Sequence, residues 1–354
     1  MKKVGIVTLF DCDNYGNRLQ CYALQQVLSS LEGVLALQIP NYSFLNENKH
    51  YYLRLLKHLT NLKSFSKNKR RKENFKIFER NINYSRFIYT AKTKKIDMDY
   101  VIVGSDQVWN PNFGRLRQVD LLSIIDPSKR ISYAASFGVS DIQLNKIRMA
   151  VEELQKFKKI SVREEDGKRI IERATKRKDI EVLLDPTMLL EKEQWIKVEK
   201  KPKMLKSKKY ILNYFLGELD SNAELQIQKI AHENKCEVIN ILDKNSPFYE
   251  CGPSEFLYLE RNAFLICTDS FHSAVFSIIF GKPFVVFDRK QDGMKNMNSR
   301  IETLLSKTGL KNKKYLGDIQ IKDYLECDYS TAYSIIEKEK EKSIRFIKEA
   351  LDLK

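Results

Sequence analysis

The chain has 354 residues, a length that suits two α/β domains better than one. Hydrophobic residues make up 43% of it, yet no apolar run reaches the roughly 18 residues of a membrane-spanning helix, so no such helix is expected. The net charge of +16 is concentrated in residues 49–95, which hold 15 Lys or Arg and only 2 Asp or Glu. A nucleic-acid-binding protein usually spreads its basic residues over the binding fold, so nucleic acid is not an expected partner.

Short apolar runs alternate with helical periodicity in the first half of the chain. The runs predict strands at 4–9, 34–39, 100–103, 131–136, 160–163 and 182–184. The spacing of Leu19, Leu24 and Val27 predicts a helix after the first strand, and further helices are expected at 141–158 and 165–176. Because this alternation is typical of a parallel sheet, residues 1–195 are predicted to form an N-terminal Rossmann-like domain.

A basic helical insertion is expected at residues 49–95 of this domain. Apolar residues mark its two amphipathic helices, Leu53, Leu56, Leu59 and Leu62 in the first and Phe75, Ile77 and Phe78 in the second. Two interpretations stay open for the first helix. Its leucine stripe packs on its own domain, or it lies loosely at an anionic membrane, where each basic residue contributes about 1 kcal/mol.

The second half of the chain repeats the same alternation after a lysine-rich linker. Strands are expected at 210–215, 237–241, 264–267 and 283–287, with helices at 221–234, 253–262, 271–280 and 298–309. Residues 210–325 are therefore predicted to form a C-terminal Rossmann-like domain, and residues 326–354 a C-terminal helix. The predicted fold is α/β, with the two domains in a glycosyltransferase-B-like arrangement.

The cysteines and the first ten residues indicate in which cellular compartment the protein is expected. The six cysteines are scattered without a CxxC pair, so neither a zinc site nor any other metal is expected, and disulfides are not expected. The apolar run Val4–Phe10 is short and is followed by acidic residues, which favours a buried strand over a signal peptide. A cytoplasmic protein is expected.

The first candidate motif, Asn14-Tyr15-Gly16-Asn17-Arg18, follows the first strand and opens a helix. Free N–H groups at the helix start and the close approach that Gly16 permits could hold an anion, so Asn14, Gly16 and Asn17 are candidate binding residues. The alternative is a capped turn. Neither GxGxxG nor a P-loop occurs, so a nucleotide fingerprint is absent.

The second motif follows the strand at 100–103. Ser105, Asp106, Gln107 and Asn110 could hydrogen-bond sugar hydroxyls, and Trp109 could stack on a sugar ring. Ligands of open α/β sheets bind outside the carboxyl ends of strands, which favours a binding role. The alternative is a polar loop anchored by a buried tryptophan.

Three further candidates carry charge or acid–base chemistry. Arg163 ends a strand with a planar group suited to carboxylate or phosphate, although an ion pair with Glu164 or Glu165 is the alternative. His272, one of four histidines, lies in the first turn of a helix between Ser270 and Ser273, where it suits general acid–base catalysis or is simply packed.

Lys290 follows the next strand and could reach the same crevice as His272. Its alternative is a solvated surface lysine.

Eight segments, in order, resemble the polysaccharide pyruvyl transferase family. They are NYGNRLQ (14–20), VIVGSDQVWNP (101–111), ISYAASFG (131–138), ISVRE (160–164), LLDPT (183–187), GPSEFL (252–257), TDSFHS (268–273) and GKPFVVFDR (281–289). The resemblance implies transfer of a pyruvyl group from phosphoenolpyruvate to sugar hydroxyls, which forms a cyclic ketal in surface polysaccharide synthesis. It also implies a two-lobed fold and a donor site that contains Arg163, His272 and Lys290. Asp106 is a candidate base, no cofactor is expected, and the insertion 49–95 departs from the family pattern.

Two other functions remain as alternatives. A nucleotide-sugar glycosyltransferase would hold its nucleotide with Glu255 and the helix that begins at Pro253. A non-catalytic binder of anionic surfaces would depend on residues 49–95 alone. For the transferase, the expected acceptor is a sugar, a glycan or a lipid-linked saccharide, reached at the inner face of the membrane.

Overall fold

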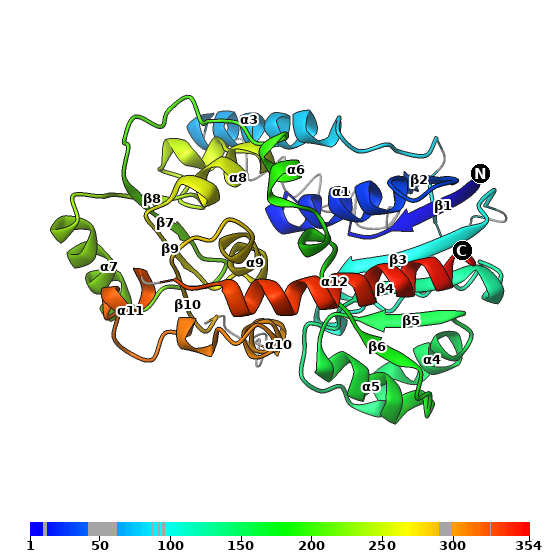
Figure 1. The fold of residues 1–354 in the computed structure, drawn as a ribbon. Coiled ribbons are helices and arrows are strands. Elements are labelled where there is room, and N and C mark those ends of the chain that lie inside the picture. Colours follow the sequence, from blue (N-terminus) through cyan, green and yellow to red (C-terminus); the bar gives the residue numbers. More distant parts are fainter. Residues whose placement is uncertain are drawn as a thin grey trace. The chain divides into compact units, whose positions relative to one another are not determined.

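The computed structural model describes residues 1–9, 13–41, 62–86, 88–90, 93, 96–289, 299–325 and 327–354, with the side chains of 62–66 and 144–146 excepted. These residues divide into two compact units (Figure 1). The first unit is drawn from Met1–Leu56, Arg80–Leu190 and Glu337–Lys354. The second is drawn from Lys57–Glu79 and Glu191–Ile336. Each unit contains its own parallel sheet.

The first unit is built on a six-stranded parallel sheet in the order β2-β1-β3-β4-β5-β6. Its strands are β1 (Lys2–Val7), β2 (Val34–Gln38), β3 (Tyr100–Asp106), β4 (Arg130–Ala135), β5 (Lys159–Val162) and β6 (Ile180–Val182). Both faces of the central strands are buried, as the continuous apolar runs of their sequences predict. The strand order reverses between β1 and β3, which makes that crevice the expected ligand position.

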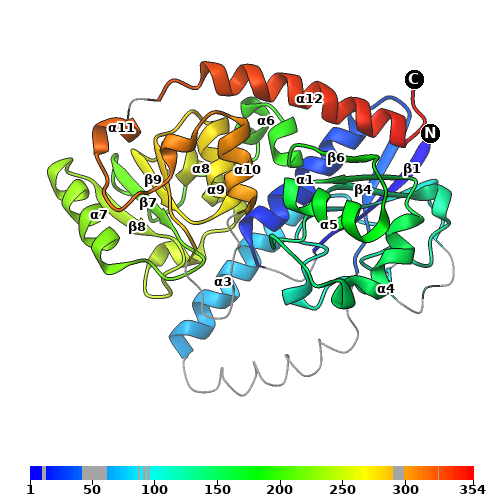
Figure 2. The same ribbon diagram turned by 90° about the horizontal axis from the view of Figure 1, so that it is seen from below.

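Helices cover both faces of this sheet (Figure 2). On one face lie α4 (Leu144–Gln155) and α5 (Glu165–Thr175), whose apolar side chains join the core with Val103 and Phe137. On the other lie α1 (Tyr15–Ser29) and the later part of α12 (Ser330–Ala350). Three 3-10 helices occupy loops, η1 (Pro111–Phe113), η2 (Pro127–Lys129) and η3 (Pro186–Leu189).

The second unit has a four-stranded parallel sheet in the order β10-β9-β7-β8. Its strands are β7 (Tyr210–Tyr214), β8 (Glu237–Asn240), β9 (Leu265–Thr268) and β10 (Phe284–Val286). Here the order reverses between β7 and β9. Its remaining elements are α6 (Lys192–Ile196), α7 (Ser221–Glu233), η4 (Pro247–Glu250), α8 (Pro253–Asn262), α9 (Phe271–Ile279), α10 (Ser299–Lys307), η5 (Lys311–Lys313) and α11 (Ile321–Leu325).

The second basic helix of the expected insertion is α3 (Leu62–Glu79), and it is part of the second unit rather than of the N-terminal domain. Phe75 and Phe78 are buried, and the buried guanidinium of Arg71 donates to Tyr249 O at 3.0 Å. Contacts of this kind pack α3 on η4 and α8. Phe75 and Phe78 therefore stabilise the second unit, whereas Ile77 is 45% exposed. Of the stripe predicted for the first helix, Leu62 is the first residue of α3, and Leu53, Leu56 and Leu59 lie outside the described residues.

The C-terminal helix is present as α12, and the structure assigns its Glu337–Ala350 part to the first unit. Ion pairs join the end of the chain to that unit, from Lys158 to Asp352 and from Lys159 to Glu349. In the described part of the chain, no helix is both long and apolar enough to span a membrane.

Candidate functional site

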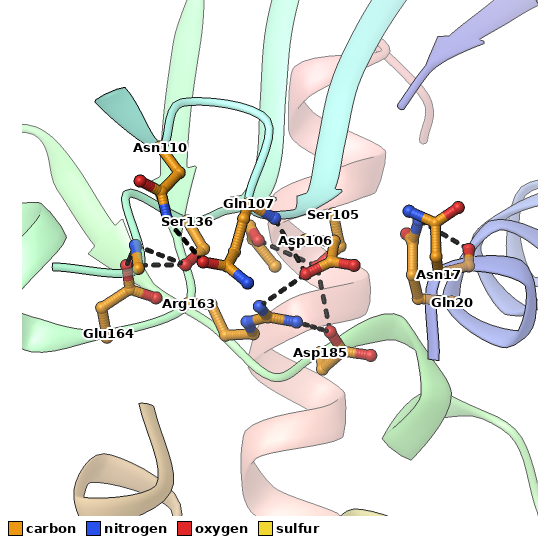
Figure 3. Close-up of polar contacts among 12 residues, drawn as sticks. Asn17, Gln20, Ser105, Asp106, Gln107, Asn110, Ser136, Arg163, Glu164 and Asp185 are labelled. Carbon is orange, nitrogen blue, oxygen red and sulfur yellow. Dashed lines mark hydrogen bonds and ion pairs between the residues drawn. The ribbon is translucent and has the colours of Figure 1, made fainter. Parts of the chain in front are cut away.

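Polar side chains meet at the carboxyl ends of β3, β5 and β6 in the first unit (Figure 3). We call Ser105, Asp106, Arg163, Glu164 and Asp185 the first-unit cluster. The Ser105 hydroxyl lies 2.9 Å from Ala134 O and 3.0 Å from Asp185 Oδ2. Asp106 has a left-handed φ of 69°, a conformation that non-glycine residues adopt rarely and often at functional sites.

Arg163 is the centre of this cluster. Its side chain is 1% exposed and forms ion pairs with Asp185 Oδ2 at 2.6 Å and Asp106 Oδ1 at 3.1 Å. Burial opposes the charge, but Asp185, Asp106 and Glu164 outweigh it and raise the pKa of the guanidinium. The ion-pair alternative is therefore correct in kind, with close ion pairs to the two aspartates and an electrostatic contribution from Glu164.

Glu164 connects the ends of β4 and β5. Its Oε1 accepts from the Ser136 hydroxyl and from Phe137 N, both at 2.9 Å. Gly138, with φ +65°, follows at once, and a Cβ there would lie 2.1 Å from Gln107 Oε1. The positive φ favours glycine at residue 138, and a side chain there would displace the amides of Gln107 and Asn110 in the loop after β3.

Within that β3 loop, two residues predicted to bind a sugar, Gln107 and Asn110, are hydrogen-bonded to each other. Asn110 donates to Gln107 Oε1 at 2.5 Å and caps η1 by accepting from Asn112 N. Asn110 is buried and Gln107 is half-buried. These amides give the loop its shape.

Trp109 cannot stack on a sugar ring, because its side chain is fully buried. Its ring packs against Phe137 and Phe157, at centroid distances of 5.5 and 5.8 Å, and its Nε1 donates to Asp120 O at 2.9 Å. The prediction of sugar stacking is wrong and the anchoring alternative is right. An apolar aromatic ring after a strand fits either role, so the sequence could not distinguish them.

The motif after β1 is a capped turn at the start of α1. The Asn14 side chain accepts from Asn17 N at 3.1 Å, which satisfies one helix N–H without an anion. Gly16 is buried. Asn17 and Gln20 of α1 are also buried, and Figure 3 shows them on the side of the cluster that carries Ser105 and Asp106.

A second set of polar groups lies at the carboxyl ends of β7, β9 and β10 in the second unit. Asp269 follows β9 and accepts from Leu216 N at 2.7 Å and from Gly217 N at 2.8 Å, both just after β7. Arg289 pairs with Asp269 Oδ2 at 3.3 Å and donates to Asp269 O at 3.1 Å. These contacts join the two strands that flank the switch point of this sheet.

His272 lies in the first turn of α9, directly after these groups, and is 6% exposed. Ser270 is the N-cap residue, yet within the described residues its side chain makes no cap hydrogen bond. The turn itself carries no acidic side chain, and the carboxylate of Asp269, which precedes Ser270, is paired with Arg289. An anion would be stabilised there.

Ser273 is predicted to bind substrate, but its side chain is hydrogen-bonded within the protein interior. Its hydroxyl donates to Glu260 Oε1 at 2.5 Å, and both residues are fully buried. Burial raises the pKa of Glu260 well above its ordinary value of 4.5, an effect that outweighs the opposing hydrogen bond from Ser273. This pair connects α8 to the first turn of α9.

The remaining candidates have different outcomes. Lys290 lies outside the described residues. Arg163 belongs to the first unit and His272 to the second, so their convergence on one crevice stays a prediction.

Glu255, the candidate nucleotide ligand of the glycosyltransferase alternative, already has partners within the protein. Its carboxylate accepts from Gly252 N in a capping arrangement and pairs with Lys200 at 3.1 Å.

Sequence reasoning did not single out Asp185, Gln20, Asp269 or Glu260 as site residues. Asp185 directly follows the strand predicted at 182–184, and Asp269 lies two residues after the strand predicted at 264–267, which is a signal that could have found them. Glu260 lies within a predicted helix, and nothing in its spacing marks it as functional.

Comparisons with known proteins identify the family of the chain. A family model described as polysaccharide pyruvyl transferase matches residues 14–291, which include residues of both polar sets. No match was found among curated proteins.

Among solved structures, S. aureus MnaA with UDP is 11% identical, with a TM-score of 0.50 and coverage of 100% of this chain and 98% of that one. UDP-GlcNAc 2-epimerase from Neisseria meningitidis bound to UDP-GlcNAc is 12% identical, covers 99% of both chains and has a TM-score of 0.48. The Methanocaldococcus jannaschii UDP-GlcNAc 2-epimerase in complex with UDP-GlcNAc and UDP is 15% identical, with 96% and 99% covered and a TM-score of 0.47. The likeness to MnaA shows the fold, and the predicted GT-B-like α/β fold with parallel sheets is confirmed.

Proposed function

We propose that this chain, which belongs to the polysaccharide pyruvyl transferase family, transfers the pyruvyl group of phosphoenolpyruvate to two hydroxyls of a sugar and closes a cyclic ketal. The family match over residues 14–291 is the observation that carries the proposal. It makes the chain a pyruvyl transferase by family. The donor, the ketal product and the roles of individual residues are our proposals.

The second unit suits the donor. Phosphoenolpyruvate carries a phosphate and a carboxylate, and both favour cationic surroundings. The first turn of α9 presents His272 without a neighbouring carboxylate in the turn, and Arg289 lies beside Asp269 just before it. Lys290, next in sequence, would add a second cation to this group. We assign phosphoenolpyruvate to this end of the second sheet.

The chemistry needs one proton donor and one acceptor. His272 would protonate the methylene carbon of phosphoenolpyruvate, which turns it into a methyl group and makes C2 electrophilic, or would assist the departure of phosphate. A sugar hydroxyl adds to C2, the C2–O bond to phosphate breaks, and a second hydroxyl closes the ketal. Of the two hydroxyl protons, one balances the new methyl C–H bond and the other leaves with phosphate.

Asp106 is our candidate for the base that receives a hydroxyl proton. Arg163 holds Asp106 and Asp185 by ion pairs, so it positions the two carboxylates. The resemblance to the family implied a direct role for Arg163 at the donor. Its enclosure by two aspartates supports a positioning role within the first unit.

Peripheral contact with an anionic membrane is a further part of the proposal. Lys69, Lys72 and Lys76 recur on the exposed side of α3, while Phe75 and Phe78 of the same helix are buried. Ile77 of α3 is 45% exposed. Contact through α3 would therefore be mainly electrostatic, with Ile77 as an apolar side chain at the same surface. A lipid-linked acceptor would be presented at such a surface.

Calorimetric titration tests the donor assignment. Phosphoenolpyruvate should bind the purified protein, and UDP-GlcNAc should not. His272→Ala should weaken phosphoenolpyruvate binding, while His232→Ala, an exposed histidine on α7, should leave it unchanged. Binding of UDP-GlcNAc but not of phosphoenolpyruvate would favour the glycosyltransferase alternative instead.

A further inference from the structure

Two buried amide side chains on α1 offer polar atoms that nothing in the described protein uses. Asn17 is 1% exposed, and neither its Oδ1 nor its Nδ2 has a hydrogen-bond partner among the described residues. Gln20 is 0% exposed, and its Oε1 also has no hydrogen-bond partner among the described residues. Leaving a buried polar atom unsatisfied costs about 1–3 kcal/mol, so such atoms point to a bound group.

These amides lie at the switch point of the first sheet. Gln20 Nε2 donates to Thr8 Oγ1 at 2.8 Å, and Thr8 Oγ1 donates to Ser105 O at 3.0 Å. Helix α1 also packs on η3, which follows Asp185. Figure 3 shows Asn17 and Gln20 on the Ser105–Asp106 side of the cluster. A group bound by Asn17 would therefore lie between the ends of β1 and β3, where open α/β sheets bind ligands.

The charges and donors of this site favour a neutral hydroxyl-bearing ligand. The first-unit cluster contains three carboxylates and the guanidinium of Arg163, and buried Arg18 adds one more cation at the end of β1. The carboxylates outnumber the cations, which disfavours a multiply charged anion. Asn17 supplies two donors and an acceptor, and Gln20 supplies an acceptor. Sugar hydroxyls, which both donate and accept, match this set.

We propose that Asn17 and Gln20 form the recognition site for hydroxyl groups of the sugar acceptor, with the acceptor bound to the first unit beside Asp106. The inference rests on the proposed function, because it names the acceptor side of that reaction. Asn17 acts as a specificity-determining residue and takes no part in proton transfer.

Saturation-transfer NMR without phosphoenolpyruvate tests the site directly. The probes are methyl β-galactoside, methyl α-mannoside and methyl β-glucoside. We expect at least one of them to bind the wild-type protein. Asn17→Leu, which keeps the volume and removes the amide, should weaken that binding about 30-fold, the equivalent of two lost hydrogen bonds. Asn222→Leu, at an exposed position of α7, is the matched control and should bind as wild type does.

Stability separates recognition from a structural role. Because Asn17 brings unsatisfied polar atoms into the interior, Asn17→Leu should melt at the same temperature as wild type or at a higher one. A lower melting temperature together with unchanged sugar binding would show that Asn17 only supports the fold, and would overturn the inference.

Phosphoenolpyruvate titration keeps this test apart from the proposed function. Asn17→Leu should bind phosphoenolpyruvate within about twofold of wild type, since a hydrogen bond lost elsewhere leaves the donor contacts intact. An equal loss of sugar and phosphoenolpyruvate binding, or no binding of any of the three glycosides to wild type, would overturn the acceptor site. Failure of wild type to bind phosphoenolpyruvate would instead overturn the proposed function.

Discussion

At the residue scale, the two polar sets differ in how their charges are balanced. In the first unit the positive charge of Arg163 is balanced by ion pairs with Asp106 and Asp185. In the second unit His272 follows an N-cap serine whose side chain makes no cap hydrogen bond among the described residues. A fixed ion pair suits positioning, and a histidine at a positive helix end suits proton transfer beside an anion.

His272→Ala should preserve the fold and reduce turnover by roughly 10²–10⁴, the range for loss of a general acid or base. Phosphate release from phosphoenolpyruvate with a competent acceptor measures it. His232→Ala provides the control. Activity within a few-fold of wild type would remove His272 from the mechanism.

Trp109→Phe should lower the stability of the first unit without changing the affinity for a sugar. The ring remains in the core, but Asp120 O loses its donor, at a cost of about 1–3 kcal/mol. Chemical denaturation followed by circular dichroism measures the loss. A weaker sugar affinity with unchanged stability would instead support the stacking interpretation that burial argues against.

At the element scale, the first turn of α9 is held from two sides. Asp269 joins it to the loop after β7, and Ser273 joins it to Glu260 of α8. The Glu260 carboxyl is buried among apolar elements, which favours its protonated form. The proton on Glu260 therefore contributes to the packing of α8 against α9.

Glu260→Gln should make the protein less sensitive to high pH. The raised pKa means that the folded protein binds a proton which the unfolded chain releases above pH 4.5. That stability is fully present below this pH and is lost as the pH rises toward the folded-state pKa, by at most about 1.4 kcal/mol per pH unit. The advantage of Glu260→Gln over wild type should therefore grow with pH.

Tryptophan fluorescence in the Trp109→Phe background measures this advantage, because Trp195, the other of the two tryptophans, packs against Phe276 of α9. Parallel stability curves for the two proteins between about pH 5 and pH 9 would contradict the protonated carboxyl.

The exposed lysines of α3 should bind anionic vesicles weakly and reversibly. Each contributes about 1 kcal/mol near the surface, and salt should release the protein. Co-sedimentation with phosphatidylglycerol vesicles at low and high salt measures it. Replacement of Lys69, Lys72 and Lys76 by glutamine should abolish binding. The same change at Lys176, Lys178 and Lys235, which are exposed elsewhere, should not. No binding of wild type at low salt would defeat the membrane proposal.

At the scale of the whole molecule, each unit places its polar groups where its strand order reverses. This follows from βαβ connections, since all parallel strands end at the same edge and a reversal opens a crevice there. In the first sheet Ser105 lies at the end of β3 and Asn17 in the helix after β1, and in the second sheet Leu216 and Asp269 follow β7 and β9. Under the proposed function, one such edge would bind the acceptor and the other the donor.

Most of this architecture could be predicted from the sequence, because short apolar runs such as residues 100–103, which alternate with segments of helical periodicity, are typical of buried parallel strands. The position of α3 could not be predicted, because Phe75 and Phe78 indicate an apolar helix face but do not indicate which part of the protein packs against it. The roles of Trp109 and Ser273 likewise became clear only from their burial in the structure. Their residue types suit a sugar site, and only the packing around them shows that they belong to the interior.

The most direct test of the account is to follow the carbon of phosphoenolpyruvate. Phosphoenolpyruvate labelled with a heavy carbon isotope at C2 is incubated with the enzyme and a bound methyl glycoside, and the product is examined by NMR. The account predicts a labelled quaternary ketal carbon on the sugar and an equal amount of released phosphate. Label that stays in phosphoenolpyruvate, or that is released only as free pyruvate, would contradict it.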